Sequence, residues 1–187
     1  MLKEMSRIAY IGLGSNLDSP AGSPAEMLLA ATESLATLGT IVARSSFYRT
    51  APVGFEKQPA FVNAVVALRT DYEPEKLLGS LLGIERSFGR DRATGVTKGP
   101  RTLDLDLLLL DYIIHQSQSL ILPHPELARR RFVLAPLVEI APQIIHPVLR
   151  RTAQELLAEL PDEGANRRTA VQVIGTMSRG NSEKKRI

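Results

Sequence analysis

The chain has 187 residues, of which 44% are hydrophobic and 23% are charged, as is usual for a globular protein. It contains no cysteine, which excludes disulfides and thiolate metal sites. No apolar run is long enough to span a bilayer, and residues 1–5 show no signal-peptide pattern, so we expect a soluble cytoplasmic protein without a membrane partner.

Positive charge is distributed unevenly along the chain. The net charge is +3, but the segment from Gly164 onward has six Arg and Lys residues against one Glu, which leaves −2 for the rest. An acidic body is not typical of a nucleic-acid-binding protein. We therefore expect one catalytic domain over residues 1–163 that acts as a monomer on small molecules, not on nucleic acid, followed by a flexible basic tail over residues 164–187.

Strand and helix patterns alternate over the first part of the chain. A capping box at Ser23 with proline at the first helical position starts the first helix, which Gly39 ends. The predicted order is strand 7–14, helix 24–38, strand 40–50, strand 60–69, helix 74–88 and strand 103–110. This β-α-β-β-α-β order is that of the ferredoxin-like fold, an α+β fold with helices packed on an antiparallel sheet.

The patterns after Asp111 are shorter. They predict a short β excursion over 113–122, a helical turn over 126–131, and helices over 132–140 and 152–160. We interpret these as a C-terminal helical extension of the core.

The turn after the first strand contains the first two glycines of a dinucleotide-binding fingerprint, Gly12 and Gly14. Leu17 stands where the third glycine would be, so the motif is only a weak indication of nucleotide binding.

The last strand of the core has two acidic residues at alternate positions. Asp104 and Asp106 project from one face of the strand, while Leu103, Leu105 and Leu107 point the other way into a core. Two adjacent carboxylates repel each other unless a cation, a shared proton or water stabilises them. Paired carboxylates suit Mg²⁺. Because the leucines place the strand in the interior, we favour a metal site over a solvated strand edge.

A basic, glycine-containing loop over 89–99 precedes this strand. Arg90, Arg92 and Arg101 lie in or just after it, and arginine pairs bidentately with phosphate oxygens. Together with the acidic pair, they indicate metal-assisted phosphoryl-type transfer that depends on positioning and charge neutralisation. The chain has no Walker A motif or kinase glycine loop, so a nucleotide must be held in another way.

Three further polar residues each have a functional and a structural interpretation. Glu85 lies near a helix C-terminus, where an anion is disfavoured, so it either has a cationic neighbour such as Arg90 or is exposed. Asn63 interrupts an apolar strand and is either a satisfied buried amide or a group that contacts a ligand. His124 lies between two prolines and is the histidine best placed for a functional role.

Six stretches together resemble the 6-hydroxymethyl-7,8-dihydropterin pyrophosphokinase family of folate biosynthesis. They occur in the family's order over roughly residues 6–160, and GPRTLDLD is the most specific of them. The stretches are AYIGLGSNL (9–17), SSFYRTAPVG (45–54), QPAFVNAVV (58–66), GPRTLDLDLLL (99–109), LPHPEL (122–127) and RRFVLAPLVEIAP (130–142).

The resemblance implies an enzyme that binds ATP with two Mg²⁺ ions and transfers pyrophosphate to the pterin hydroxymethyl group, releasing AMP. It implies that Asp104 and Asp106 bind both metal ions. The implied ATP contacts are Glu85, Arg90, Arg101 and His124, with Arg92 acting from the loop and Leu110 and Leu120 enclosing adenine. The implied pterin contacts are Thr50, Val53, Phe61, Asn63, Arg130 and Phe132.

Two alternatives from other classes remain open on the residues alone. The ferredoxin-like order is shared with RNA-recognition modules, although the strands lack an exposed aromatic pair on which bases would stack. A Mg²⁺-dependent nuclease could use the acidic pair, but it would need a long basic groove that the charge distribution does not provide.

Overall fold

The computed structural model describes residues 6–19, 22–52, 58–90, 99–161 and 171–177. Within these ranges, no helix has the length and apolar character needed to cross a membrane. In chain order the elements are β1 (Arg7–Ser15), α1 (Pro24–Leu35), β2 (Thr40–Arg44), β3 (Ser46–Thr50), β4 (Phe61–Thr70), α2 (Pro74–Ser87), β5 (Asp104–Leu110), β6 (His115–Gln116), β7 (Ile121–Leu122), α3 (Arg131–Ile140), α4 (Ala153–Glu159) and β8 (Gln172–Thr176).

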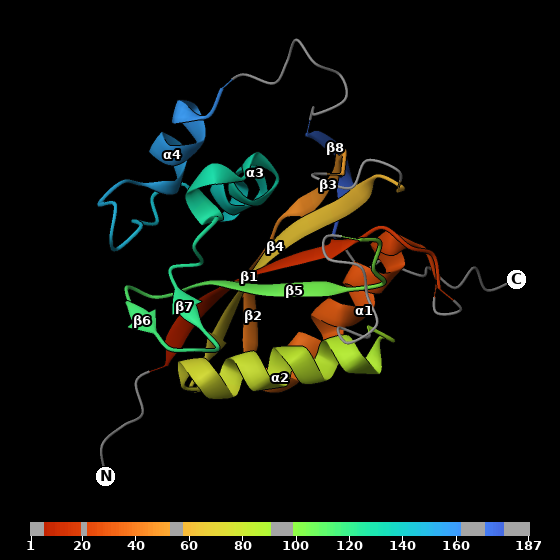
Figure 1. Ribbon diagram of the computed structural model, residues 1–187, viewed down its shortest axis with the longest axis horizontal. Coiled ribbons are helices and arrows are strands. Elements are labelled where there is room, and N and C mark those ends of the chain that lie inside the picture. The colour runs from red at the N-terminus through yellow and green to blue at the C-terminus, as the bar shows by residue number, and fades with distance from the viewer. Residues whose placement is uncertain (1–5, 20–21, 53–57, 91–98, 162–170, 178–187) are drawn as a thin grey trace, which may run out of the picture.

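The main sheet is antiparallel, with β1 and β4 at its centre (Figure 1). Strand β5 pairs with the outer edge of β1, and both β2 and β3 pair with β4. Together with α1 and α2, this is the ferredoxin-like arrangement. The α+β fold predicted from the sequence is confirmed, as is the helical extension after β5.

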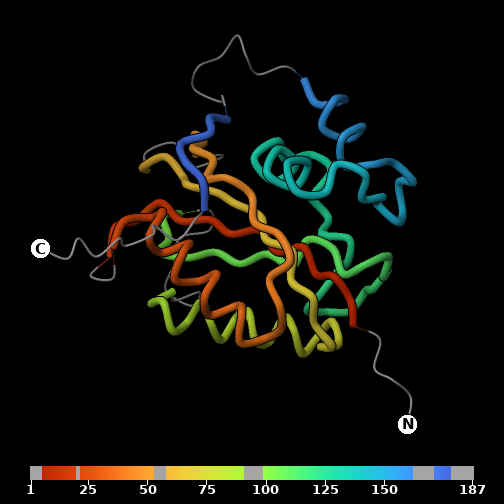
Figure 2. Tube along the Cα trace, turned by 180° about the vertical axis from the view of Figure 1, so that it is seen from behind, coloured from red at the N-terminus to blue at the C-terminus, as the bar shows by residue number. Residues whose placement is uncertain are grey.

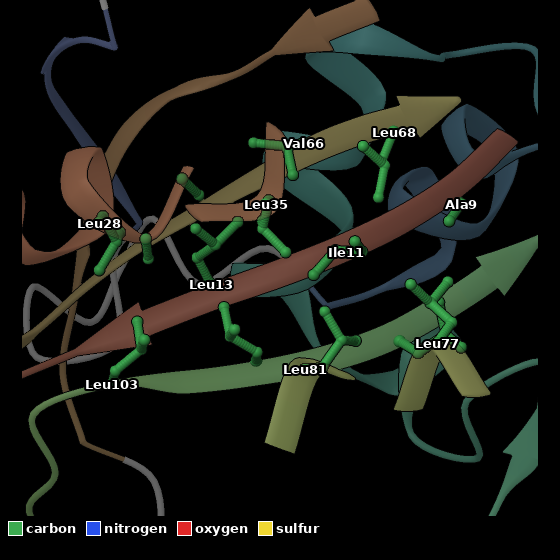
Figure 3. Close-up of a cluster of buried hydrophobic side chains, with 14 of the residues drawn as sticks. Ala9, Ile11, Leu13, Leu28, Leu35, Val66, Leu68, Leu77, Leu81 and Leu103 are labelled. Atoms are coloured by element: carbon green, nitrogen blue, oxygen red, sulfur yellow. The ribbon is translucent and has the colours of Figure 1, made fainter. Parts of the chain in front are cut away.

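Helices cover both faces of the sheet. One face packs against α1 and α2 in the main hydrophobic cluster, which includes Ile11, Leu68, Leu77, Leu81 and Leu105 (Figure 3). The other face packs against α3 through a second cluster, which includes Val65, Leu108, Val133, Leu134 and Leu137, and α4 packs in turn on α3. Burying these clusters is the main favourable contribution to folding.

The single strand predicted over 40–50 is divided in two at Ser45. The Ser45 hydroxyl accepts a hydrogen bond from the Val65 backbone N–H at 2.9 Å, and the Ser45 N–H donates to the Val65 carbonyl at 2.9 Å. A side-chain oxygen therefore replaces a backbone carbonyl in the ladder between β4 and its neighbours. The break leaves β2 and β3 as separate strands on the same edge of β4.

The expectation of an unstructured tail from residue 164 is wrong for residues 172–176, which form β8. This strand pairs antiparallel with β3, and Figure 2 shows the two side by side. Strand β3 would otherwise be an edge strand with a row of unpaired backbone groups, which β8 pairs. The rest of the predicted tail lies outside the described residues, apart from Val171 and Met177.

Candidate active site

A cavity of about 370 Å³ opens on the face of the sheet that α3 covers in part. Its floor is formed by the facing residues of β1, β4 and β5, and its walls by the end of β3, the start of α3 and the chain just before β8. Lining residues include Gly12, Gly14, Thr50, Phe61, Asn63, Arg101, Asp104, Asp106, Arg129, Arg130, Phe132 and Val171.

Two glycines of β1 make room for this cavity. Gly14 pairs with Asn63 on one side and Asp104 on the other, and Gly12 pairs with Asp106. A Cβ at Gly14 would lie 3.2 Å from the Asn63 Oδ1 atom, so a larger side chain would fill the space between the amide and the carboxylates. Glycine in the interior of a strand commonly marks such a close approach.

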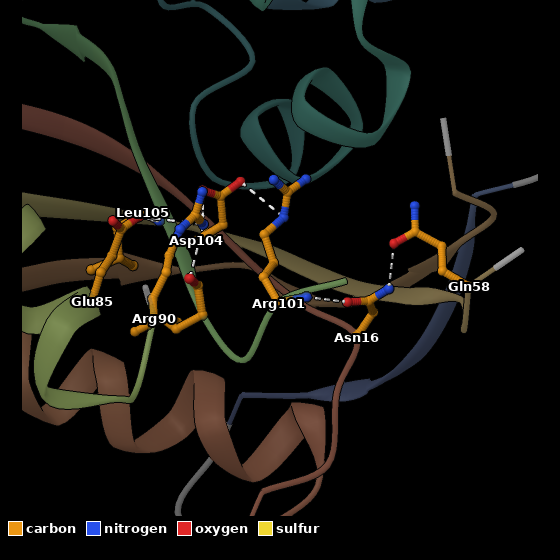
Figure 4. A network of polar contacts seen from close by, with 8 residues as sticks. Asn16, Gln58, Glu85, Arg90, Arg101, Asp104 and Leu105 are labelled. Atoms are coloured by element: carbon orange, nitrogen blue, oxygen red, sulfur yellow. Dashed lines mark hydrogen bonds and ion pairs between the residues drawn. The ribbon is translucent and has the colours of Figure 1, made fainter. Parts of the chain in front are cut away.

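Asp104 and Asp106 project from the same face of β5, as the sequence predicts. Asp104 forms ion pairs with two arginines, through Arg90 Nη1 and through Arg101 Nε, which lies 3.5 Å from Asp104 Oδ2 (Figure 4). Arg90 also donates to the Leu103 carbonyl at 2.9 Å. Asp104 is therefore already neutralised by protein groups.

Asp106 lacks an ion pair with any residue in the described part of the chain. Burial raises the pKa of Asp106 above its ordinary value, and repulsion from Asp104 raises it further. His124 is close enough to oppose this shift, while burial lowers the pKa of the His124 imidazole itself. The acidic pair thus combines one neutralised carboxylate with one that a cation would stabilise.

Glu85 of α2 contacts both β5 and Arg90. It is only 1% exposed, so the alternative of an exposed margin residue is wrong. One carboxylate oxygen accepts a hydrogen bond from the Leu105 N–H at 2.8 Å and lies 3.6 Å from Arg90 Nη1 (Figure 4). The cationic neighbour predicted for Glu85 is therefore present, and Glu85 connects α2 to both β5 and Arg90.

The opposite end of the cavity presents an amide and an aromatic ring. Asn63 is 7% exposed, and its Nδ2 donates to the Thr50 hydroxyl at 2.7 Å. Phe61 lies beside it on β4, with the Arg101 guanidinium 5.1 Å from its ring centroid. Phe132 of α3 has the same kind of partner, with the Arg130 guanidinium at 5.8 Å. Both aromatic faces can therefore accept a flat, electron-poor group.

Several positively charged groups line the cavity near the acidic pair. Arg129, Arg130 and Arg131 line it from the chain at the start of α3, although the Arg131 Nη2 donates to the Leu160 carbonyl at 2.9 Å and the Pro161 carbonyl at 3.0 Å. The Nε atom of Arg101 is buried and, apart from its 3.5 Å ion pair with Asp104 Oδ2, has no hydrogen-bond acceptor among the described residues. This concentration of guanidinium groups suits a small polyanion.

The donor set at the acidic pair suits a hard divalent cation that also binds phosphate. Among the described residues, no cluster of three or more His, Cys, Asp or Glu side chains could hold a metal ion alone. A pair of carboxylates fits Mg²⁺, which commonly takes one or two protein carboxylates and completes its shell with water and phosphate oxygens. The pair does not form the closed nitrogen or sulfur cage typical of structural zinc.

Comparison with known proteins places the chain in a family. The sequence model of 7,8-dihydro-6-hydroxymethylpterin-pyrophosphokinase (HPPK) matches residues 10–142, more than half of the chain. The chain belongs to this family. The resemblance found in the sequence is thereby confirmed, and the RNA-binding and nuclease alternatives are set aside.

Individual relatives agree with this assignment. The chain is 42% identical over 161 residues to the 2-amino-4-hydroxy-6-hydroxymethyldihydropteridine pyrophosphokinase of Methylorubrum extorquens, covering 85% of this chain and 97% of that protein. It is 43% identical to the Haemophilus influenzae protein of the same name, covering 74% of this chain and 84% of that protein.

Some relatives are much longer than this chain. The match to folic acid synthesis protein fol1 of Pneumocystis carinii is 42% identical and covers 74% of this chain, but only 18% of that protein. A crystal structure of a Plasmodium falciparum HPPK-DHPS variant with pterin and p-hydroxybenzoate superposes with a TM-score of 0.66 at 16% identity. The superposition covers 85% of this chain and 44% of that one. At 16% identity this likeness establishes only that the two chains share the fold.

The structure brings most of the predicted site residues together. Those that line the cavity are Thr50, Phe61, Asn63, Arg101, Asp104, Asp106, Arg130 and Phe132. Glu85, Arg90 and His124 do not line it but act on the acidic pair, as described above.

Four predicted residues are not part of this group. Leu110 and Leu120 lie in the main hydrophobic cluster and do not line the cavity. Their implied contact with adenine stays a prediction. Val53 and Arg92 lie outside the described residues.

Asn16, which the sequence analysis did not single out, connects three segments of the site. Its Oδ1 accepts a hydrogen bond from the Arg101 N–H at 2.8 Å. Its Nδ2 donates to Gln58 Oε1 at 3.0 Å (Figure 4). It also donates to the Pro59 carbonyl at 3.0 Å. Asn16 is only 2% exposed. Only its place beside the GLG motif could have drawn attention to it.

We predict that Asn16→Ala destabilises the protein and increases the mobility of the segment that precedes the acidic pair. The substitution leaves the Arg101 N–H and the Pro59 carbonyl without their partner, so the free energy of unfolding should fall by about 1–3 kcal/mol. Denaturant titration measures this change, and hydrogen exchange should accelerate at residues 58–61 and 99–102. Gln143→Ala, at an exposed residue, is the control and should change neither. Unchanged exchange in both segments would contradict the role assigned to Asn16.

Proposed function

We propose that the chain transfers the β,γ-pyrophosphoryl group of ATP to the hydroxymethyl oxygen of 6-hydroxymethyl-7,8-dihydropterin, as a step of folate biosynthesis. The observation that carries this proposal is one cavity with two chemically different ends. An acidic pair with several arginines lies at one end, and an amide with aromatic rings lies at the other. The membership of the HPPK family supports the same reaction.

The charged end suits the triphosphate. Asp104 and Asp106 would hold Mg²⁺, which supplies positive charge to the phosphate oxygens and promotes ionisation of the attacking hydroxyl. Arg101 would turn its Nε from Asp104 toward phosphate, and Arg130 at the start of α3 would neutralise further negative charge. Glu85 would keep Arg90 against Asp104, which fixes that carboxylate's orientation.

The other end suits the pterin. The amide of Asn63 offers a donor and an acceptor side by side, which matches the alternating donors and acceptors on the edge of a pterin ring. Phe61 and Phe132 would flank the flat ring, in the places where guanidinium groups now lie against them. The hydroxymethyl group would then point toward the charged end.

The reaction follows from this orientation. The hydroxymethyl oxygen forms a bond to the β-phosphorus and loses its proton, while the bond from the β-phosphorus to the α–β bridging oxygen breaks. AMP leaves with that oxygen. The protein contributes chiefly by alignment of the two substrates and by charge neutralisation in a site partly shielded from water.

The deciding experiment is to incubate the purified chain with ATP, Mg²⁺ and 6-hydroxymethyl-7,8-dihydropterin and to separate the nucleotides. We expect AMP, and only when the pterin is present. ADP would indicate single phosphoryl transfer and contradict the proposed reaction. Omission of Mg²⁺, or addition of a chelator, should abolish AMP formation.

We predict that Asp106→Asn abolishes AMP formation without weakening the fold. The raised pKa means that the folded state disfavours ionised Asp106, so native stability decreases as the pH rises through this pKa. The asparagine side chain has no ionisable group, so the variant avoids this cost. At neutral pH it should unfold at no lower denaturant concentration than the wild type. Asp71→Asn, at an exposed carboxylate, is the control and should keep full activity. Near-normal turnover in Asp106→Asn would refute the metal role.

We also predict that Asn63→Ala weakens binding of the pterin much more than binding of ATP. Loss of the amide should weaken pterin binding about 10-fold or more, because the ring edge would lose paired hydrogen bonds in a site with little water. Binding of a non-hydrolysable ATP analogue should change little, since the triphosphate end is intact. Calorimetric titration with each ligand measures both. Equal losses for the two ligands would contradict the assignment of Asn63 to the pterin.

A further inference from the structure

Strand β8 lies beside the cavity but outside the part of the chain that matches the family model. That match ends at residue 142, whereas β8 spans Gln172–Thr176. Its partner β3 is the strand that ends with Thr50 at the cavity wall. A segment beyond the family match therefore reaches the candidate pterin site.

The register of the ladder places Val171 next to Thr50. Gln172 pairs with Arg49, and because the strands are antiparallel, the residue before Gln172 comes beside the residue after Arg49. Residues opposite each other on neighbouring strands project from the same face. Val171 and Thr50 accordingly both line the cavity, on the side where Thr50 accepts the hydrogen bond from Asn63.

The other end of β8 is fixed in the core. Met177 follows the strand and is only 8% exposed, within the main hydrophobic cluster. Its sulfur accepts a hydrogen bond from the Thr32 hydroxyl of α1 at 3.3 Å. All five residues of β8 itself are exposed, so the strand is held mainly by its backbone ladder and by this buried methionine. The residue before the strand, Val171, therefore lines the cavity, whereas the residue after it, Met177, is buried in the core.

We propose that Val171 is a specificity-determining residue of the pterin site, supplied by a C-terminal strand that the family match does not include. This inference rests on the proposed function of the cavity. The aliphatic side chain would contact the ring of the bound pterin beside Thr50 and exclude water from that edge. The β8–β3 ladder would hold Val171 in this place, with Met177 as its anchor in the core.

A merely structural role for Val171 makes a different prediction. If the side chain only filled space at the end of the sheet, its truncation would lower stability and affect both substrates alike. Direct contact with the ring affects the pterin alone. The difference between the two ligands therefore separates the two roles.

The test compares Val171→Ala with the matched control Val173→Ala in the full chain. Val173 lies in β8, two residues after Val171, is 60% exposed, and does not line the cavity. Calorimetry with 6-hydroxymethyl-7,8-dihydropterin, and separately with a non-hydrolysable ATP analogue, gives both dissociation constants. For Val171→Ala we expect the pterin constant to rise about 3- to 10-fold, since up to two methyl groups of contact are lost, with the ATP-analogue constant unchanged. Val173→Ala should leave both constants unchanged.

A conservative variant checks the chemistry of the contact. Val171→Ile keeps the branched aliphatic surface and should retain pterin binding within about 2-fold, whereas Val171→Asp should lose it by more than the alanine variant because it places a charge against the ring. Thermal unfolding of each variant establishes that it is folded. Equal pterin affinities for wild type, Val171→Ala and Val171→Asp would overturn the inference.

The outcomes also separate this inference from the function on which it rests. A wild-type chain that binds the pterin and produces AMP, with Val171→Ala indistinguishable from it, refutes the role of Val171 and leaves the proposed function intact. A wild-type chain that binds no pterin refutes both. Parallel losses of pterin and ATP-analogue binding in Val171→Ala would overturn the direct contact in favour of a structural role.

Discussion

The repulsion between two carboxylates on one face of a buried strand is the constraint around which the site is built. Asp104 is close enough to Asp106 to raise the cost of ionising Asp106, and the interior of a sheet offers little water to offset it. The protein neutralises Asp104 with Arg90 and Arg101 and holds Arg90 with the buried Glu85. Asp106 has no such partner in the described part of the chain. This asymmetry fits the divalent cation proposed for the pair, and the neutralisation of Asp104 lets the strand stay folded without it.

Space for the cavity comes from the centre of the sheet. Gly12 and Gly14 alternate on β1, so the face of that strand toward α3 carries no side chains between Asn63 and the carboxylates. The opposite face can be filled completely, with Ile11 and Leu13 packed against α1 and α2. One strand therefore has a dense side that contributes stability and an open side that leaves room for a ligand. The cost of two glycines within a strand is offset by the cluster on the other face.

The parts of this structure that follow from local patterns could be predicted, and those that depend on distant partners could not. Hydrophobic periodicity and capping residues were sufficient for the order of strands and helices as far as α4, apart from the break at Ser45, and the period of a strand was sufficient to place both carboxylates on one face. The break at Ser45 depends on a backbone group of β4, and the role of Asn16 depends on three segments that only the fold brings together. A sequence pattern contains no information about such long-range hydrogen bonds.

Strand β8 is another feature that depends on distant partners and could not be predicted from its own residues. Its own residues are exposed and partly polar, so composition predicts a tail without structure. What orders the segment is the unpaired edge of β3 and the space for Met177 beside α1, neither of which is encoded within residues 171–177. Pairing an exposed edge removes a site of unwanted strand addition. Because β3 ends at the cavity, the ladder that protects this edge also carries the chain to the wall of the site. The segment beyond the family match can in this way reach the cavity while the strands that carry the acidic pair keep their arrangement.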